Sequence, residues 1–185
     1  MHYNISKNSK EKYIIKTPGE HIFYFENLSA RIQFIINAEN IDLQIYGLYQ
    51  GTVDKKFDLS ITQIHNTPNS QSTTLIKSIL DDHSKLHFTG KIRIEKKAKN
   101  SKALLTNKNL LLNKKASVIS IPQLEVLPHE VECTHSAITT TLDHAQLNYL
   151  VARGLSKKNA KKLLLEGFIQ DVFFHKNYCG KSTSV

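Results

Sequence analysis

Short runs in which apolar and polar residues alternate fill the chain between residues 20 and 120. Clear examples are the runs at 31–36, 41–46 and 57–64, which are rich in β-branched and aromatic residues. A period of two with this composition is typical of half-buried strands, and no helical pattern lies between the runs. The pattern therefore predicts an all-β body. A sandwich, a barrel and a stacked β-solenoid all satisfy it, and periodicity alone does not choose among them.

A helical pattern replaces the alternation after Pro122. Asp143 can cap a first helix, with Gln146 three residues on as in a capping box, and Gly154 is well placed to end that helix. Ser156 can cap a second helix, in which apolar residues recur every four positions. The sequence therefore predicts a polar N-terminal leader over 1–17, a β body over 18–141, a helical segment over 142–175 and a flexible tail over 176–185.

Composition and charge indicate which classes of partner to expect. The chain has 185 residues, which suits one domain with a real core, and its net charge is +9. The lysines are spread along the chain and arginine occurs only three times, so we expect solvated surfaces and no nucleic-acid partner. No apolar run approaches the roughly 20 residues of a membrane helix, so we expect no membrane partner. The two cysteines do not form a disulfide framework, which favours a reducing cytoplasm.

Several short segments follow one another in an order known from one protein family. They include Ile-Pro-Gln-Leu-Glu-Val at 121–126, Val-Glu-Cys-Thr-His at 131–135 and Asp-His-Ala-Gln-Leu-Asn-Tyr-Leu-Val-Ala-Arg-Gly-Leu at 143–155. Together they resemble the SufB/SufD family of iron–sulfur cluster assembly proteins, over about residues 20–173. The resemblance implies a right-handed parallel β-helix, the SufBD core, followed by a short C-terminal α-helical hairpin. Most of the N-terminal region usual in the family is expected to be missing.

The resemblance also implies a role and partners. Such a chain would be a non-catalytic scaffold subunit that pairs with a SufB-like subunit and docks a SufC-like ATPase through its C-terminal helices; a homodimer is left open. The chain has no Gly-x-x-x-x-Gly-Lys-Ser/Thr motif to cradle a nucleotide phosphate, so energy would come from a partner. The implied cargo is a transient Fe–S cluster shared with the partner subunit, with no tightly bound cofactor in the isolated chain.

Two positions separate the SufB-like and SufD-like branches of the family. Where SufB-like chains carry a cysteine six residues before the proline, this chain has Ala116. Where they follow the histidine with a glutamate, it has Ser136, which also replaces the glycine usual in SufD-like chains. SufD-like chains carry a Cys-x-His pattern, matched here by Cys133 and His135. The resemblance therefore favours the SufD-like branch.

Cys133 and His135 are the candidate site residues. Residues two apart in a strand point to the same face, so the thiol and the imidazole can converge. Both groups are accepted ligands of iron in clusters. With the family resemblance, His135 is the first candidate for a cluster ligand or a proton-handling group, and Cys133 is either a second ligand or a core residue. Two ligands cannot complete a four-coordinate site, so the remaining ligands would come from a SufB-like partner.

Two other readings of the same residues stay open. One is an enzyme in which Cys133 is a nucleophile and His135 its base, although no Gly-rich oxyanion element follows and no third orienting residue is evident. The other is a β-solenoid interaction protein that has lost the assembly role. A Cys133 thiol that does not react with labelling reagents in the folded chain would count against the enzyme. Cluster formation that is unchanged by His135→Ala in the reconstituted complex would favour the interaction protein.

Overall fold

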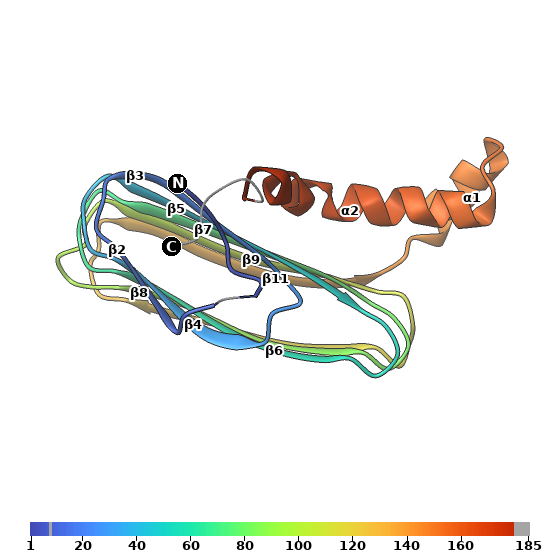
Figure 1. Cartoon of the computed structure of the whole chain (residues 1–185), viewed down its shortest axis with the longest axis horizontal. Coiled ribbons are helices and arrows are strands. Elements are labelled where there is room, and N and C mark those ends of the chain that lie inside the picture. Colours follow the sequence, from blue (N-terminus) through green and yellow to red (C-terminus); the bar gives the residue numbers. More distant parts are fainter. Residues whose placement is uncertain (8, 180–185) are drawn as a thin grey trace.

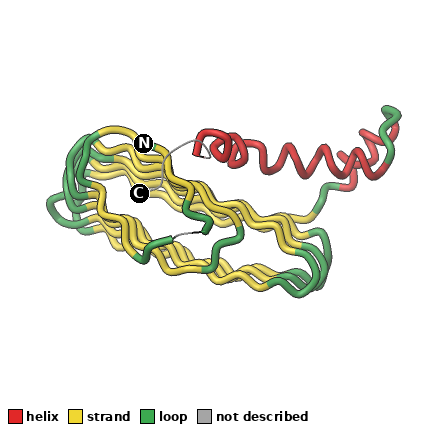
Figure 2. Tube along the Cα trace, viewed as in Figure 1, coloured by secondary structure: helices red, strands yellow, loops and turns green. Residues whose placement is uncertain are grey.

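Eleven parallel strands wind into a flattened coil, and two helices follow them (Figure 1). The computed structural model describes residues 1–7 and 9–179. Sheet A has the strand order β1-β3-β5-β7-β9-β11, and sheet B has the order β10-β8-β6-β4-β2. Alternate strands in the chain thus belong to opposite sheets, and loops gather at the two narrow ends of the coil (Figure 2). This arrangement confirms the expected parallel β-helix with two C-terminal helices and excludes a barrel.

The strands and helices have the following bounds: β1 (His2–Asn4), β2 (Lys12–Ile15), β3 (Gly19–Glu26), β4 (Ala30–Ile36), β5 (Ile41–Gly51), β6 (Lys56–His65), β7 (Gln71–Leu80), β8 (Lys85–Ile94), β9 (Ser101–Leu111), β10 (Ser117–Val126), β11 (Val131–Thr141), α1 (His144–Ala152) and α2 (Lys157–Cys179).

The core is the interior between the two sheets. Alternate residues of each strand point inward and stack on the inward residues of the next coil, because the registers pair them directly. Phe34, Ile61 and Phe88 are among the side chains with no exposed surface. Because every coil repeats this arrangement, the fold buries a continuous apolar interior from small, similar units.

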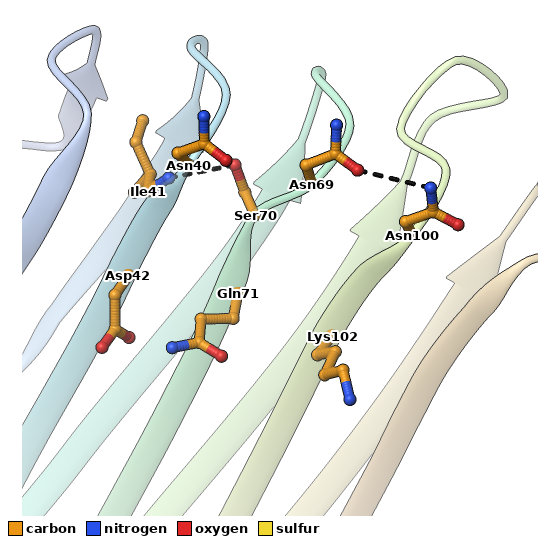
Figure 3. Close-up of a pocket in the computed structure, with 8 residues that line it drawn as sticks. All are labelled: Asn40, Ile41, Asp42, Asn69, Ser70, Gln71, Asn100 and Lys102. Carbon is orange, nitrogen blue, oxygen red and sulfur yellow. Dashed lines mark hydrogen bonds between the residues drawn. The ribbon is translucent and has the colours of Figure 1, made fainter.

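At one narrow end of the coil, the turns contain asparagines whose backbone adopts the left-handed conformation. Asn40, Asn69 and Asn100 have φ values of 56°, 56° and 54°, a region that asparagine tolerates better than most residues. They stack directly before β5, β7 and β9 (Figure 3). The backbone N–H of Asn40 donates to the carbonyl of Asn69 at 3.1 Å, and the Asn100 side chain donates to that of Asn69 at 3.3 Å. The turns therefore continue the hydrogen-bonded stacking of the strands.

The N-terminal residues correct one expectation. Residues 1–17 were expected to be a polar leader, but β1 pairs with β3 and β2 pairs with β4. Ile15 is 5% exposed, and the Tyr13 ring stacks on Phe34 with centroids 5.3 Å apart. Strands of three and four residues are too short to show alternation, so their pairing comes from the neighbouring strands rather than from a pattern of their own.

Both helices begin, and α1 ends, where the capping residues predicted. Asp143 accepts hydrogen bonds from the N–H groups of Ala145 and Gln146, at 2.8 and 3.3 Å. Gly154 has a φ of 95°, and the Ser156 hydroxyl accepts from the Asn159 N–H at 3.2 Å. The second helix runs on to Cys179, beyond the start of the expected flexible tail, and residues 180–185 of that tail lie outside the described residues.

The C-terminal half of α2 lies along the outer face of sheet A (Figure 1). Val172 is completely buried there in a small apolar cluster with Ile22, Tyr24 and Leu48. Lys77, at the centre of this face, donates to the Asp171 carboxylate and to the Phe168 carbonyl. The helix is therefore fixed to the β body, whereas α1 lies beyond the end of the sheet (Figure 2).

Candidate functional site

The last coil of the β-helix is open. Within the described residues, β10 pairs only with β8 and β11 pairs only with β9, so each strand leaves one edge without a neighbour. Unpaired edges of this kind are sites at which another chain can add a strand. The open coil is therefore one end of the β body at which a second protein can continue the fold.

The interior is not capped at the open coil. Leu124 and Val126 are in register with Ile92 and Ile94, which are fully buried one coil earlier. In the last coil the two side chains are 42% and 39% exposed. Large apolar side chains at core positions, left in contact with solvent, mark an interaction surface.

Cys133 and His135 lie at the same open coil and point inward. The register pairs them with Ala103 and Leu105, two buried core residues of β9. Cys133 is half-buried and packs against the core, whereas His135 is exposed. Burial raises the pKa of the Cys133 thiol. The thiol is therefore held as a weak nucleophile, while the imidazole is open to whatever covers the coil.

The open coil offers two soft donors and no complete metal site. Among residues 1–7 and 9–179, no group of three or more His, Cys, Asp or Glu side chains could hold a metal ion. A thiolate and an imidazole fit iron, but two donors leave half of a tetrahedral site unfilled. Any cluster held here would need ligands from a second chain or from a small molecule.

The two branch-defining positions fit the structure without distortion. Ala116 is 5% exposed and belongs to the core, so no thiol is present where the SufB-like pattern has one. Ser136 pairs with Thr106 in the ladder and is absent from the residues with positive φ. The serine therefore leaves the backbone beside His135 in an ordinary extended conformation.

Glu125 belongs to an ion-pair network on the outer face of sheet B. Its carboxylate lies 2.6 Å from the Lys91 ammonium and 3.7 Å from the Arg93 guanidinium. The Lys91 hydrogen bond, together with the charge of Arg93, lowers the pKa of Glu125. A carboxylate with a lowered pKa that is already paired on an edge strand suits an interface better than acid–base chemistry.

A shallow hollow lies at the corner formed by the three asparagines (Figure 3). Its wall includes Asn69, Asn100 and Ser70. The asparagines bond to one another, and the Ser70 hydroxyl accepts from the Ile41 N–H at 3.3 Å and donates to the Ala38 carbonyl at 3.1 Å. These groups complete the turns, so the hollow carries no argument for a ligand.

The sequence predicted that Cys133 and His135 share a face, and the structure confirms it. What the sequence analysis missed is the uncapped apolar interior around them. A signal for it exists: Leu124 and Val126 continue the inward alternation of β10 beyond Pro122, the residue after which the sequence pattern was expected to change. In the structure the strand passes through Pro122, whose missing N–H is tolerated on an edge strand.

Comparison with known proteins shows which family this chain matches. Residues 24–168 match the family described as "SUF system FeS cluster assembly, SufBD core domain". That range covers more than half of the chain and includes the open coil with Cys133 and His135. No helix within the described residues is long and apolar enough to cross a membrane.

Individual relatives agree with the family match. The iron–sulfur cluster assembly protein SufD of Escherichia coli is 31% identical over 137 residues, which are 74% of this chain and 32% of that protein. SufD of Plasmodium falciparum is 26% identical over 180 residues, or 85% of this chain and 12% of that protein. A SufBD family protein of Synechocystis is 31% identical over 107 residues, covering 58% and 24% of the two chains. The chain thus matches a third or less of the length of these relatives.

Proposed function

The chain belongs to the SufBD core family of iron–sulfur cluster assembly proteins, and from this premise we propose that it is a SufD-like scaffold subunit acting in the cytoplasm. The observation that carries the proposal is the open coil. It combines Cys133 and His135, whose thiol and imidazole are of the kinds that ligate iron, with an uncapped apolar interior and two free strand edges. A scaffold needs such an end, because the cluster has to form between two proteins.

The proposed partner at the open coil is a SufB-like subunit. A chain with a matching β-helix can continue both sheets and cover Leu124 and Val126. Strand addition would bring the partner's ligands close to His135, which is the exposed donor. The nascent Fe–S cluster is then a shared cargo, and the isolated chain is expected to hold none tightly.

The second proposed partner is a SufC-like ATPase, bound through the helical hairpin. Large apolar and aromatic side chains of α1 are open to solvent: Leu147 is buried, but Tyr149 and Val151 are 58% and 41% exposed. Leu163 of α2 is also 49% exposed. An apolar, solvent-facing hairpin that extends from a fixed helix suits docking to a partner that moves on ATP hydrolysis.

Reconstitution tests the proposal directly. The chain should co-purify with the SufB-like and SufC-like proteins of its own source, and failure to bind either would overturn the assembly role. In the reconstituted complex, His135→Ala should reduce cluster formation, followed by visible absorption and Mössbauer spectroscopy. His129→Ala is the matched control, since His129 is exposed in the loop between β10 and β11. Equal cluster yields from the two variants would favour an interaction protein without the assembly role.

The same experiments address an enzyme built on Cys133. Burial keeps its thiol protonated, and that is a poor state for a nucleophile. We therefore expect slow alkylation of Cys133 in the folded chain, measured by mass spectrometry in a Cys179→Ser background. A Thr134→Cys variant provides an exposed thiol on the same strand for comparison, and faster alkylation at Cys133 than at this thiol would support the enzyme.

A further inference from the structure

One end of a single coil of the β-helix has a polar interior. The inward positions of β6 and β7 nearest their connecting turn hold Gln63, His65, Ser72 and Thr74. All four side chains are 0–2% exposed. We refer to these four residues as the polar layer.

Both neighbouring coils are apolar at the matching positions. The registers place Phe34 and Ile92 on either side of Gln63, and Ile45 and Leu105 on either side of Thr74. The remaining flanking residues are also core residues: Ile36 and Ile94 beside His65, and Leu43 and Ala103 beside Ser72. The polar layer is thus enclosed by hydrocarbon above and below.

The polar layer contains one direct hydrogen bond, between His65 Nε2 and Ser72 Oγ at 2.7 Å. No described residue bonds to the Gln63 amide nitrogen or oxygen, to His65 Nδ1 or to Thr74 Oγ1, although all four atoms are buried. Leaving a buried polar atom unsatisfied costs about 1–3 kcal/mol, so four of them in one layer would be a heavy penalty. Native proteins remove such penalties with enclosed water.

We infer that the polar layer is an internal hydration site that holds water between the two sheets. The chemistry of the four atoms suits this ligand. The Gln63 amide supplies a donor and an acceptor, Thr74 supplies a hydroxyl, and whichever tautomer His65 adopts leaves Nδ1 as a donor or an acceptor. A water molecule needs two to four such partners, and the polar layer provides them.

The site is separate from the open coil and goes beyond the proposed function. Ser72 is in register with Ala103 of the next coil, which is in register with Cys133 of the last coil. In the same way, Thr74 is in register with Leu105, which is in register with His135. With strands about 4.8 Å apart, the polar layer lies about 10 Å below the two donors, behind one apolar coil. Water at this site therefore depends only on the fold of the chain.

The direct test is a crystal structure of the whole chain at a resolution that defines ordered water. At least one enclosed water is expected about 2.7–3.2 Å from the Gln63 amide and from either His65 Nδ1 or Thr74 Oγ1. A dry layer would overturn the inference, whether Gln63 then paired directly with Thr74 and His65 or stayed unpaired.

A solution measurement with a matched control adds a second test. Magnetic relaxation dispersion counts long-lived internal waters, and Gln63→Leu combined with Thr74→Val should remove at least one. Gln33→Leu, an exposed glutamine on the neighbouring strand β4, should leave the count unchanged. An unchanged count in the folded double variant would contradict the inference. If that variant did not fold, the crystal structure of the unaltered chain would still decide.

Discussion

The Lys77 ammonium of β7 lies 2.6 Å from the Asp171 carboxylate of α2, although 94 residues separate them in the chain. The lysine side chain is almost completely buried, whereas the aspartate side chain is 53% exposed. Lys77 also donates to the Phe168 carbonyl at 2.6 Å and lies 4.9 Å from the centre of the Phe168 ring. The contact therefore serves mainly to satisfy a cation that the docking of α2 has removed from water.

The rest of the α2 contact combines an ion pair, a stacked ring pair and a small apolar cluster. Lys176 lies 2.7 Å from the Glu26 carboxylate, and the His175 ring stacks on Tyr46 with centroids 3.7 Å apart. Val172 is the fully buried apolar residue that the helix contributes to the small cluster. Because the apolar cluster is small, we expect the charged contacts to contribute much of what holds α2 on the sheet.

Asp171→Ala should loosen α2 by removing the partner of the buried ammonium. The half-exposed aspartate limits the loss, so we expect about 1–3 kcal/mol of unfolding free energy in urea. Hydrogen exchange of the α2 amides should accelerate, while that of β5 and β7 should not. Glu166→Ala is the control, since Glu166 forms only an exposed pair with Lys162 at 3.7 Å.

A rescue variant tests the physical reason. Lys77→Met in the Asp171→Ala background replaces the unpaired cation with a flexible apolar side chain, and buried ion pairs often tolerate such replacement. Stability should return toward that of the unaltered chain. If Asp171→Ala left the α2 exchange unchanged, or if the rescue failed, the buried ammonium would not be what fixes the helix.

His65 should make the stability of the fold depend on pH. Burial lowers the pKa of His65 from 6.5 to about 4. As the pH falls below about 6.5, the unfolded chain takes up a proton that the folded chain refuses, so stability present at neutral pH is lost down to about pH 4. Between pH 6.5 and 5 the loss should be about 2 kcal/mol from this residue.

The pH dependence can be assigned with paired variants. His65→Asn should flatten the fall in unfolding free energy between pH 7.5 and 5, whatever its effect on absolute stability. His129→Asn is the matched control for the loss of one imidazole, since His129 is exposed in the loop between β10 and β11. Burial also lowers the pKa of His175, which therefore contributes in the same direction and should leave part of the slope in His65→Asn. A slope equal to that of the unaltered chain would show that His65 is not the buried titrating group.

The alternation of β6 explains what the sequence could and could not predict of the interior. Phe57, Leu59 and Ile61 are inward and apolar, so pattern and burial agree. The inward Gln63 is then polar while its outward neighbour Ile64 is apolar, which inverts the pattern at the polar layer. The alternation with a period of two correctly predicts a strand here. It does not reveal that the polar residues at this end of the strand are the buried ones.

Other features depend on contacts between residues far apart in the chain, so the sequence pattern did not predict them. Lys77 reads as a solvent-facing residue of a strand and is buried only because a helix far along the chain covers it. Local signals were reliable by contrast, since Asp143 and Gly154 act through neighbouring backbone groups and mark both ends of α1. Strand geometry predicts that Cys133 and His135 share a face. Their exposure to solvent could not be predicted in this way, because it depends on where the described β body ends.

Val53 is a strained position that substitution should relieve. It has a φ of 61° and is 65% exposed, at a turn where the next coil has Asp82 with a φ of 53°. A β-branched residue pays for this conformation, whereas asparagine adopts it at several other corners. Val53→Asn should raise the unfolding free energy by about 1 kcal/mol in urea. Val53→Ala keeps most of the backbone strain, and an equal gain from alanine would contradict this explanation.

The open coil yields the sharpest prediction for partner binding. Leu124 and Ile119 lie on the same edge strand and are 42% and 59% exposed, but only Leu124 points toward the interior. If a SufB-like subunit continues the β-helix end to end, Leu124 becomes a core residue of the complex. Leu124→Asp should then weaken binding by about 100-fold, which corresponds to about 3 kcal/mol for a charge placed in an apolar contact.

Calorimetric titration with the purified partner measures this loss, and Ile119→Asp is the matched control. Ile119 faces outward beside His87, so an aspartate there should change affinity by less than about tenfold. Both variants should unfold at nearly the same urea concentration as the unaltered chain, because both side chains are solvent-accessible before the complex forms. A larger loss from Ile119→Asp than from Leu124→Asp would mean that the partner binds the outer face of sheet B instead of extending the coil.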